Sequence, residues 1–116
     1  MDRNEFKKKV QEEFQIKLWG NEINQKIERE ILREMEERKK GFEMKIKIEE
    51  NFIAEMEKSH KYEDRQKKKK SEEIRDGLRK QLENQGRQIE ICQKRIERLE
   101  MEETAYNRSL RLAKEF

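Results

Sequence analysis

Four consecutive lysines, Lys67, Lys68, Lys69 and Lys70, are the residues of this chain whose type and spacing most directly suggest binding chemistry. Ammonium groups attract carboxylates and phosphates, so the run could bind an acidic protein surface or a nucleic acid, or it could be only the solvated face of a helix. Successive helical residues are turned by about 100°, so four lysines in a row point all around a helix. A helix that reads a DNA groove needs its basic residues on one face and a dimerising segment in fixed register after them. The sequence GLRKQLENQG that follows fits this poorly, so nucleic acid is the least favoured partner.

No combination of residues typical of an enzyme is found in the sequence. His60 is the only histidine and Cys92 the only cysteine, so neither has the companions that a metal site or a catalytic thiol requires. The four glycines are scattered and form no phosphate-binding loop. We therefore expect no enzymatic activity, no catalytic or metal-binding residue, no cofactor and no small-molecule substrate.

The apolar residues of the first third of the chain are spaced mainly by four. A four-residue step turns by about 400°, so such a stripe drifts by about 40° per step around its helix and does not keep to one face. This drift suits a helix that lies against a surface, or a non-ideal bundle, better than a regular zipper. Tryptophan is also enriched where interfaces are strongest. Packing inside the protein is the alternative, but the pattern makes Trp19, Ile23 and Ile27 candidate partner-binding residues.

Heptad spacing appears in the middle and last thirds. The middle series runs from Phe42 to His60 in alternating steps of four and three. The last third alternates threes and fours over about four heptads, which predicts a coiled-coil seam. Polar Gln85 and Glu103 interrupt this seam and could fix its register. Its apolar members are Leu82, Ile89, Cys92, Ile96, Leu99, Tyr106, Leu110 and Ala113, and we expect Cys92 to be a small buried side chain there.

Composition sets the fold class. Charged residues make up 49% of the 116-residue chain, hydrophobic residues only 31%, and proline is absent. This is the composition of a coiled coil and not of a protein with a sizeable core. The sequence therefore predicts an all-α protein of one or a few long extended helices without a globular core. We divide it into residues 1–60, a charged seam gap at 61–77 and a coiled-coil segment at 78–116, with Gly20 and Gly41 as the positions where the first helix could break.

Charge and hydropathy bear on location. The net charge is only +3, whereas residues 61–70 hold six basic and two acidic side chains. The pairs Glu63–Lys67 and Asp64–Lys68, four residues apart, favour a helix through this stretch. No apolar run approaches a transmembrane length, and the first residues lack the apolar region of a signal peptide. We expect a cytoplasmic protein, cytoskeletal proteins included, and no membrane partner.

The last third, from QLENQGRQIEICQKRIERLE to MEETAYNRSLRLAKEF, resembles coiled-coil proteins of ciliary and flagellar doublet microtubules, of the trichohyalin-plectin-homology or ribbon-associated type. The shared features are Gln/Arg/Glu-rich helices, a short Glu-rich stretch and then Tyr-Asn followed by alanine and lysine. The resemblance implies a structural filamentous protein of the axoneme that stabilises the lattice, with tubulin and other coiled-coil proteins as partners. The alternative is a dimeric coiled-coil adaptor or tether, joined through residues 82–113.

Overall fold

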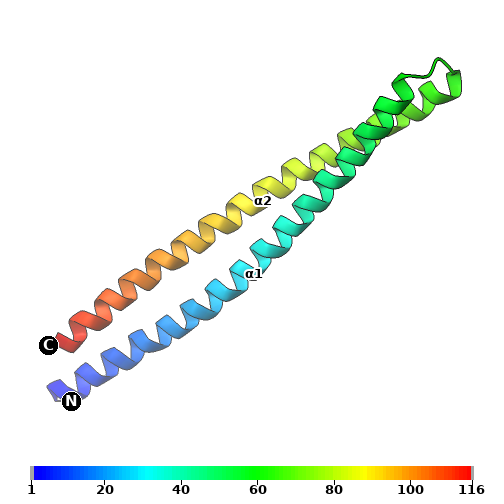
Figure 1. Cartoon of the computed structure of the whole chain (residues 1–116). Helices are drawn as coiled ribbons and strands as arrows, with labels where there is room; N and C mark the ends of the chain where they lie inside the picture. The colour runs from blue at the N-terminus through cyan, green and yellow to red at the C-terminus, as the bar shows by residue number, and fades with distance from the viewer. Residues whose placement is uncertain (1, 116) are drawn as a thin grey trace. The chain divides into compact units, whose positions relative to one another are not determined.

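The computed structural model describes residues 2–115 and contains two long helices, α1 (Arg3–Glu57) and α2 (Tyr62–Glu115) (Figure 1). No strand occurs among these residues. The prediction of an all-α protein of long helices without a globular core is confirmed. Met1 and Phe116, which end the predicted segments 1–60 and 78–116, lie outside the described residues.

Helix α1 starts at a cap and continues through both of its glycines. Asp2 precedes the helix, and its Oδ1 accepts a hydrogen bond from the Glu5 backbone N–H at 2.8 Å. Gly20 and Gly41 are both helical and neither has a positive φ. Each glycine costs about 1 kcal/mol relative to alanine in a helix interior. The good helix formers around them outweigh this cost, so α1 has no break at either position.

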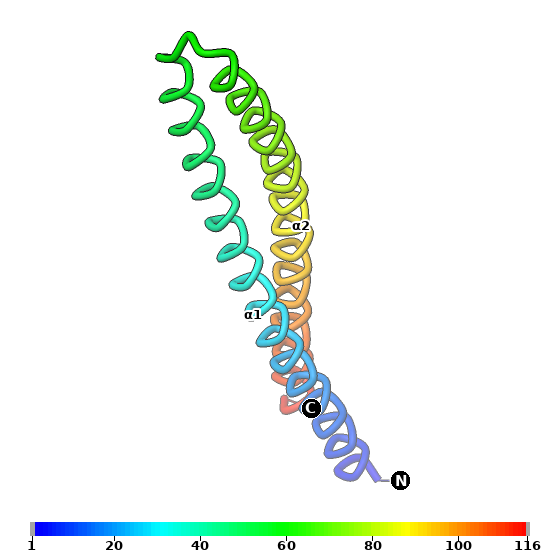
Figure 2. Tube along the Cα trace, turned by 90° about the vertical axis from the view of Figure 1, so that its right-hand side faces the viewer, coloured from blue at the N-terminus to red at the C-terminus, as the bar shows by residue number. Residues whose placement is uncertain are grey.

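A short turn at residues 58–61 separates the helices; Figure 2 traces it between the two backbone coils. The backbone N–H groups of Lys58 and Ser59 donate to carbonyls three residues back, so the end of α1 tightens. Ser59 Oγ donates to Asp64 Oδ2 at 2.5 Å and accepts from the Lys61 backbone N–H at 3.3 Å. The acidic residues of the first turn of α2 also suit the positive end of the helix dipole. The predicted middle series therefore stops short of His60, which lies exposed in the turn.

The described chain packs as two units. One combines the residues up to Leu32 with those from Ile91 onward, and the other is formed by Arg33–Glu90. In the first unit the matched pairs are Phe14 with Tyr106, Asn21 with Leu99, and Glu28 with Cys92. Each step of seven residues forward along α1 is thus matched by seven backward along α2. The segments are antiparallel and follow a heptad register, as in a coiled coil.

The second unit is an antiparallel helical hairpin closed by the turn. Gln85 Nε2 donates to the Met35 carbonyl at 3.2 Å, and Ser71 Oγ donates to the Glu49 carboxylate. These pairs are fourteen residues apart on each helix, which is two heptads. Ile46, Ile53 and Ile89 are buried in this unit.

The face of α1 that packs in the first unit differs from the drifting apolar stripe. The residues of α1 that are turned away from solvent follow steps of four and three: Phe14, Leu18, Asn21, Gln25, Glu28 and Leu32. Half of these are polar, so the apolar pattern alone does not reveal the heptad. Of the apolar residues spaced by four, Trp19, Ile23 and Ile27 fall on the exposed side, whereas Phe14 and Leu18 are half-buried on the packed face.

Candidate interaction surfaces

Cys92 belongs to the packed seam of the first unit and is 0% exposed. Its single S–H is shared between the Glu28 carbonyl and Glu28 Oε2, each 3.3 Å from Sγ. Burial, and then the neighbouring Glu28 carboxylate, raise the pKa of the Cys92 thiol, while Arg95 acts in the opposite direction. A buried thiol held in its protonated form is a packing group and a poor nucleophile.

The other seam residues predicted in the last third also face α1. In the first unit Ile96 and Ala113 are buried, and Leu99, Tyr106 and Leu110 are half-buried. In the second unit Ile89 is buried and Leu82 half-buried. Each unit therefore fills this seam with α1 of the same chain. A dimer joined through the seam would first have to open the hairpin.

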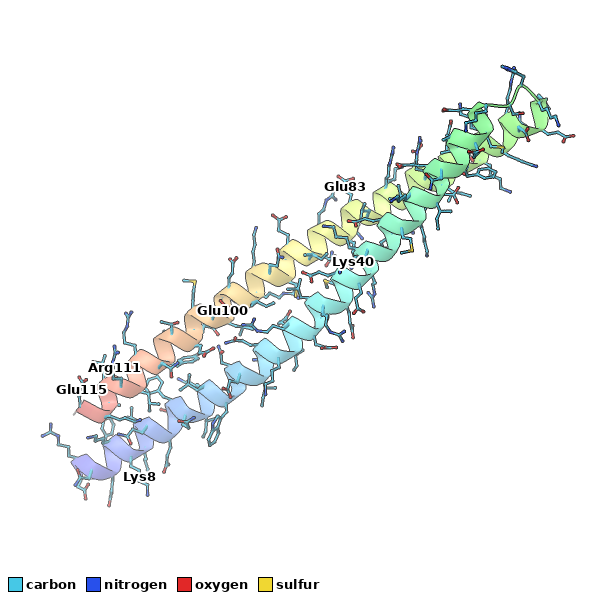
Figure 3. All side chains as sticks on the ribbon, in the orientation of Figure 1. Lys8, Lys40, Glu83, Glu100, Arg111 and Glu115 are labelled. Carbon is cyan, nitrogen blue, oxygen red and sulfur yellow. The ribbon has the colours of Figure 1, made fainter. Side chains whose placement is uncertain are left out.

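A hydrogen-bond network crosses the first unit at the polar seam positions. Asn21 is 4% exposed and donates through Nδ2 to the Leu99 carbonyl at 2.8 Å. Gln25 is 7% exposed; its Nε2 donates to Asn21 Oδ1 at 2.6 Å and to the Glu103 carboxylate. Its Oε1 accepts from Arg29, which also pairs with Glu100 at 2.9 Å; Glu100 is labelled in Figure 3. Buried groups joined this way fix one register of the helices.

The four consecutive lysines, residues 67–70, differ in their surroundings. Lys68 is half-buried, and its Nζ lies 3.4 Å from Glu57 Oε1 and 3.8 Å from Glu72 Oε1. Lys67, Lys69 and Lys70 are exposed, and none of them forms an ion pair within residues 2–115. One lysine is therefore part of the hairpin's own packing, and three are available to a partner.

Lys67 and Lys70 line a hollow between the helices of the second unit, which we call the basic groove. Its volume is about 320 Å³, and Ile48, Phe52 and Ile74 supply its apolar lining. These three side chains are 60%, 40% and 46% exposed. We did not predict the groove from the sequence, because its members come from both helices at positions beside the seam. Once the antiparallel register is known, the heptad pattern of each helix shows which positions beside the seam line the groove.

A second exposed apolar surface lies on α1 in the first unit. Ile16, Trp19, Ile23 and Ile27 are 63%, 57%, 59% and 52% exposed, and we call them the outer stripe. Because successive residues turn by about 100° around the helix axis, these four positions span an arc of roughly 80°, on the side of the helix away from Phe14 and Leu18. The sequence pattern pointed to Trp19, Ile23 and Ile27, and the structure adds Ile16 to the same face.

No group of three or more His, Cys, Asp or Glu side chains among residues 2–115 could hold a metal ion. Neither described helix has a stretch that is both long and apolar enough to cross a bilayer. Comparisons with protein-family models, with curated proteins and with solved structures find no match for this chain.

Proposed function

We propose that this chain is a structural, non-enzymatic protein that binds along a larger protein assembly through its outer stripe. The observation that carries this proposal is the exposure of four large apolar side chains on one face of α1. Contiguous apolar surface on a charged protein is typical of an interaction site. Burying each large apolar side chain contributes about 1.5–3 kcal/mol, so covering several of them adds several such contributions to the binding free energy of a partner.

The assembly to test first is a ciliary or flagellar doublet microtubule. Its support is the resemblance of residues 81–116 to coiled-coil proteins of doublet microtubules, which implies tubulin as a partner. Lys67, Lys69 and Lys70 would add Coulomb attraction to an acidic surface such as that of tubulin, and this part of the binding would weaken with salt.

The packed seam favours this docking role over a dimeric adaptor joined through residues 82–113. Separating the helices would expose Cys92, Ile96 and their neighbours, which are buried against α1. A seam dimer would therefore have to replace contacts that the single chain already makes.

The test compares two matched double variants. Trp19→Ala with Ile23→Ala removes half of the outer stripe, and Met101→Ala with Leu112→Ala truncates exposed apolar side chains elsewhere in the same unit. We expect the wild-type chain and the control to sediment with microtubules and to localise to axonemes in a ciliated cell. The stripe variant should bind at least about tenfold more weakly, since each tenfold corresponds to about 1.4 kcal/mol. Equal binding by both double variants would overturn the proposal, as would a wild-type chain that neither sediments nor localises.

A further inference from the structure

The two sides of the second unit differ in their charge chemistry. On one side, ion pairs join the helices: Arg79 lies 2.9 Å from Glu50, and Lys68 lies 3.4 Å from Glu57. The basic groove, lined by Lys67 and Lys70, has no such pair among the described residues. The one carboxylate that lines it, on Glu49, accepts a hydrogen bond from Ser71. The groove is therefore apolar along its base, with two cationic groups left for an acidic partner.

The outer stripe has the complementary character. It is exposed and apolar like the base of the groove, but its surroundings are acidic. Residues 12–37, which contain it, hold eight acidic and four basic side chains, whereas residues 61–70 hold two acidic and six basic ones. Glu12 and Glu13 precede the stripe and Glu34 follows it. All three are exposed, and none forms an ion pair within residues 2–115.

We propose that the outer stripe of one copy of this chain docks into the basic groove of a second copy. The proposal rests on the role of the stripe as a docking surface and gives that surface a second partner, which would compete with the larger assembly for the same stripe. A helix that lays apolar side chains three and four residues apart into a two-helix groove is a common mode of recognition. Here Ile23 and Ile27 would contact the apolar base, while the Glu34 carboxylate, about 10 Å further along α1 than Ile27, would meet Lys67 and Lys70.

This contact is heterologous, because the two surfaces that meet are different. Each copy keeps one free stripe or one free groove after binding, so association continues into a chain of copies or closes into a ring. Four side chains on one surface and three on the other form a contact smaller than the roughly 1,200–2,000 Å² of stable complexes. Association should therefore be weak and concentration-dependent, and salt should weaken it further.

Sedimentation velocity of the purified chain at low salt tests the contact directly. We expect monomers in the micromolar range and a growing series of larger species at hundreds of micromolar. The groove variant Lys67→Glu with Lys70→Glu and the stripe variant Trp19→Ala with Ile23→Ala should each stay monomeric. Lys61→Glu with Lys69→Glu makes the same change in net charge outside the groove and should associate like the wild type. Circular dichroism would check that every variant keeps its helices.

Mixing the two single-surface variants gives the decisive result. The groove variant keeps an intact stripe and the stripe variant keeps an intact groove, so the mixture should form dimers of twice 14.4 kDa and nothing larger. Association of the groove variant alone would mean that stripes pair with stripes and would overturn the proposal. A wild-type chain that is monomeric at hundreds of micromolar would also overturn it. If that monomer still binds microtubules through the stripe, the proposed function stands and only the self-association fails.

Discussion

The buried amide of Gln25 allows a sharp test of how the helices are held in register. Gln25→Leu places an apolar side chain at a 7% exposed seam position and removes three hydrogen bonds. Asn21 Oδ1 then loses the donor it has within this seam, and the Glu103 carboxylate loses its amide partner. Arg29 keeps Glu100 as an acceptor. The change therefore leaves two polar groups poorly satisfied in a partly dry interface.

The magnitude follows from two opposing terms. Each buried group left without its hydrogen bond costs about 1–3 kcal/mol, which gives roughly 2–6 kcal/mol for the two. Burying the leucine side chain returns about 1.5–3 kcal/mol. The midpoints of the two ranges, about 4 and about 2 kcal/mol, give an expected net loss of about 2 kcal/mol in the free energy of unfolding, or a fall of several degrees in Tm for a chain of this size.

Gln85→Leu is the matched control, because the same substitution there leaves nothing unsatisfied. Gln85 Nε2 donates only to the Met35 carbonyl, which keeps its bond within α1. This variant should be neutral or stabilised. The triple variant Asn21→Leu, Gln25→Leu, Glu103→Leu removes the polar groups of the network together. It should be more stable than Gln25→Leu and equal or exceed the wild type, as found when buried polar groups are replaced as a set.

Urea unfolding followed by circular dichroism measures these differences, with sedimentation to report the number of chains. An apolar seam no longer specifies one register, so the triple variant should also populate additional oligomers. If Gln25→Leu proves as stable as Gln85→Leu, the hydrogen-bond network does not stabilise the first unit as the geometry indicates, and it does not hold the helices in register.

Two further predictions concern burial. The raised pKa of Cys92 means that folding retains the thiol proton, so this contribution to stability is complete below the unfolded thiol pKa of about 8.5 and is lost as the pH rises above it. Urea midpoints measured from pH 7 to 10 should fall more steeply for the wild type than for Cys92→Ala, and parallel curves would contradict this. Ile53 is 6% exposed, and its change to alanine should lower the free energy of unfolding by about 2 kcal/mol or more. Ile48 is 60% exposed, and the same change there should lower it by less than about 0.5 kcal/mol. Equal losses in thermal unfolding would show that the two residues do not differ in burial.

The sequence was informative where the apolar residues themselves occupy the heptad positions. Every predicted seam residue of the last third, from Leu82 to Leu110, is turned away from solvent. The sequence left a break at Gly20 or Gly41 open, and the continuity of α1 through both is explained by the helix-forming residues around them. Both results depend on local physics that a single sequence carries.

The packed face of α1 in the first unit could not be read in the same way. Asn21, Gln25 and Glu28 occupy its seam, and polar residues at buried positions are recognised only once their partners on α2 are known. The sequence indicates the turn at residues 58–61 only weakly, through Ser59 and Asp64, whose side chains form a hydrogen bond there. The sequence contains no local indication of the basic groove, because the residues that line it come together only through the pairing of the two helices.

The arrangement of α1 in the first unit gives the strongest physical argument for a partner. Its seam holds Asn21 and Gln25, while Trp19 and Ile23 lie outside the seam and are more than half exposed. Folding alone would favour the reverse, because apolar groups gain by burial whereas buried amides only recover the hydrogen bonds they gave up in water. The polar seam is therefore best explained as a device that fixes register, and the outer stripe as surface reserved for binding. If nothing covers the stripe, substituting its residues with polar ones should improve solubility at no cost to any interaction, and that outcome would remove the argument for a partner.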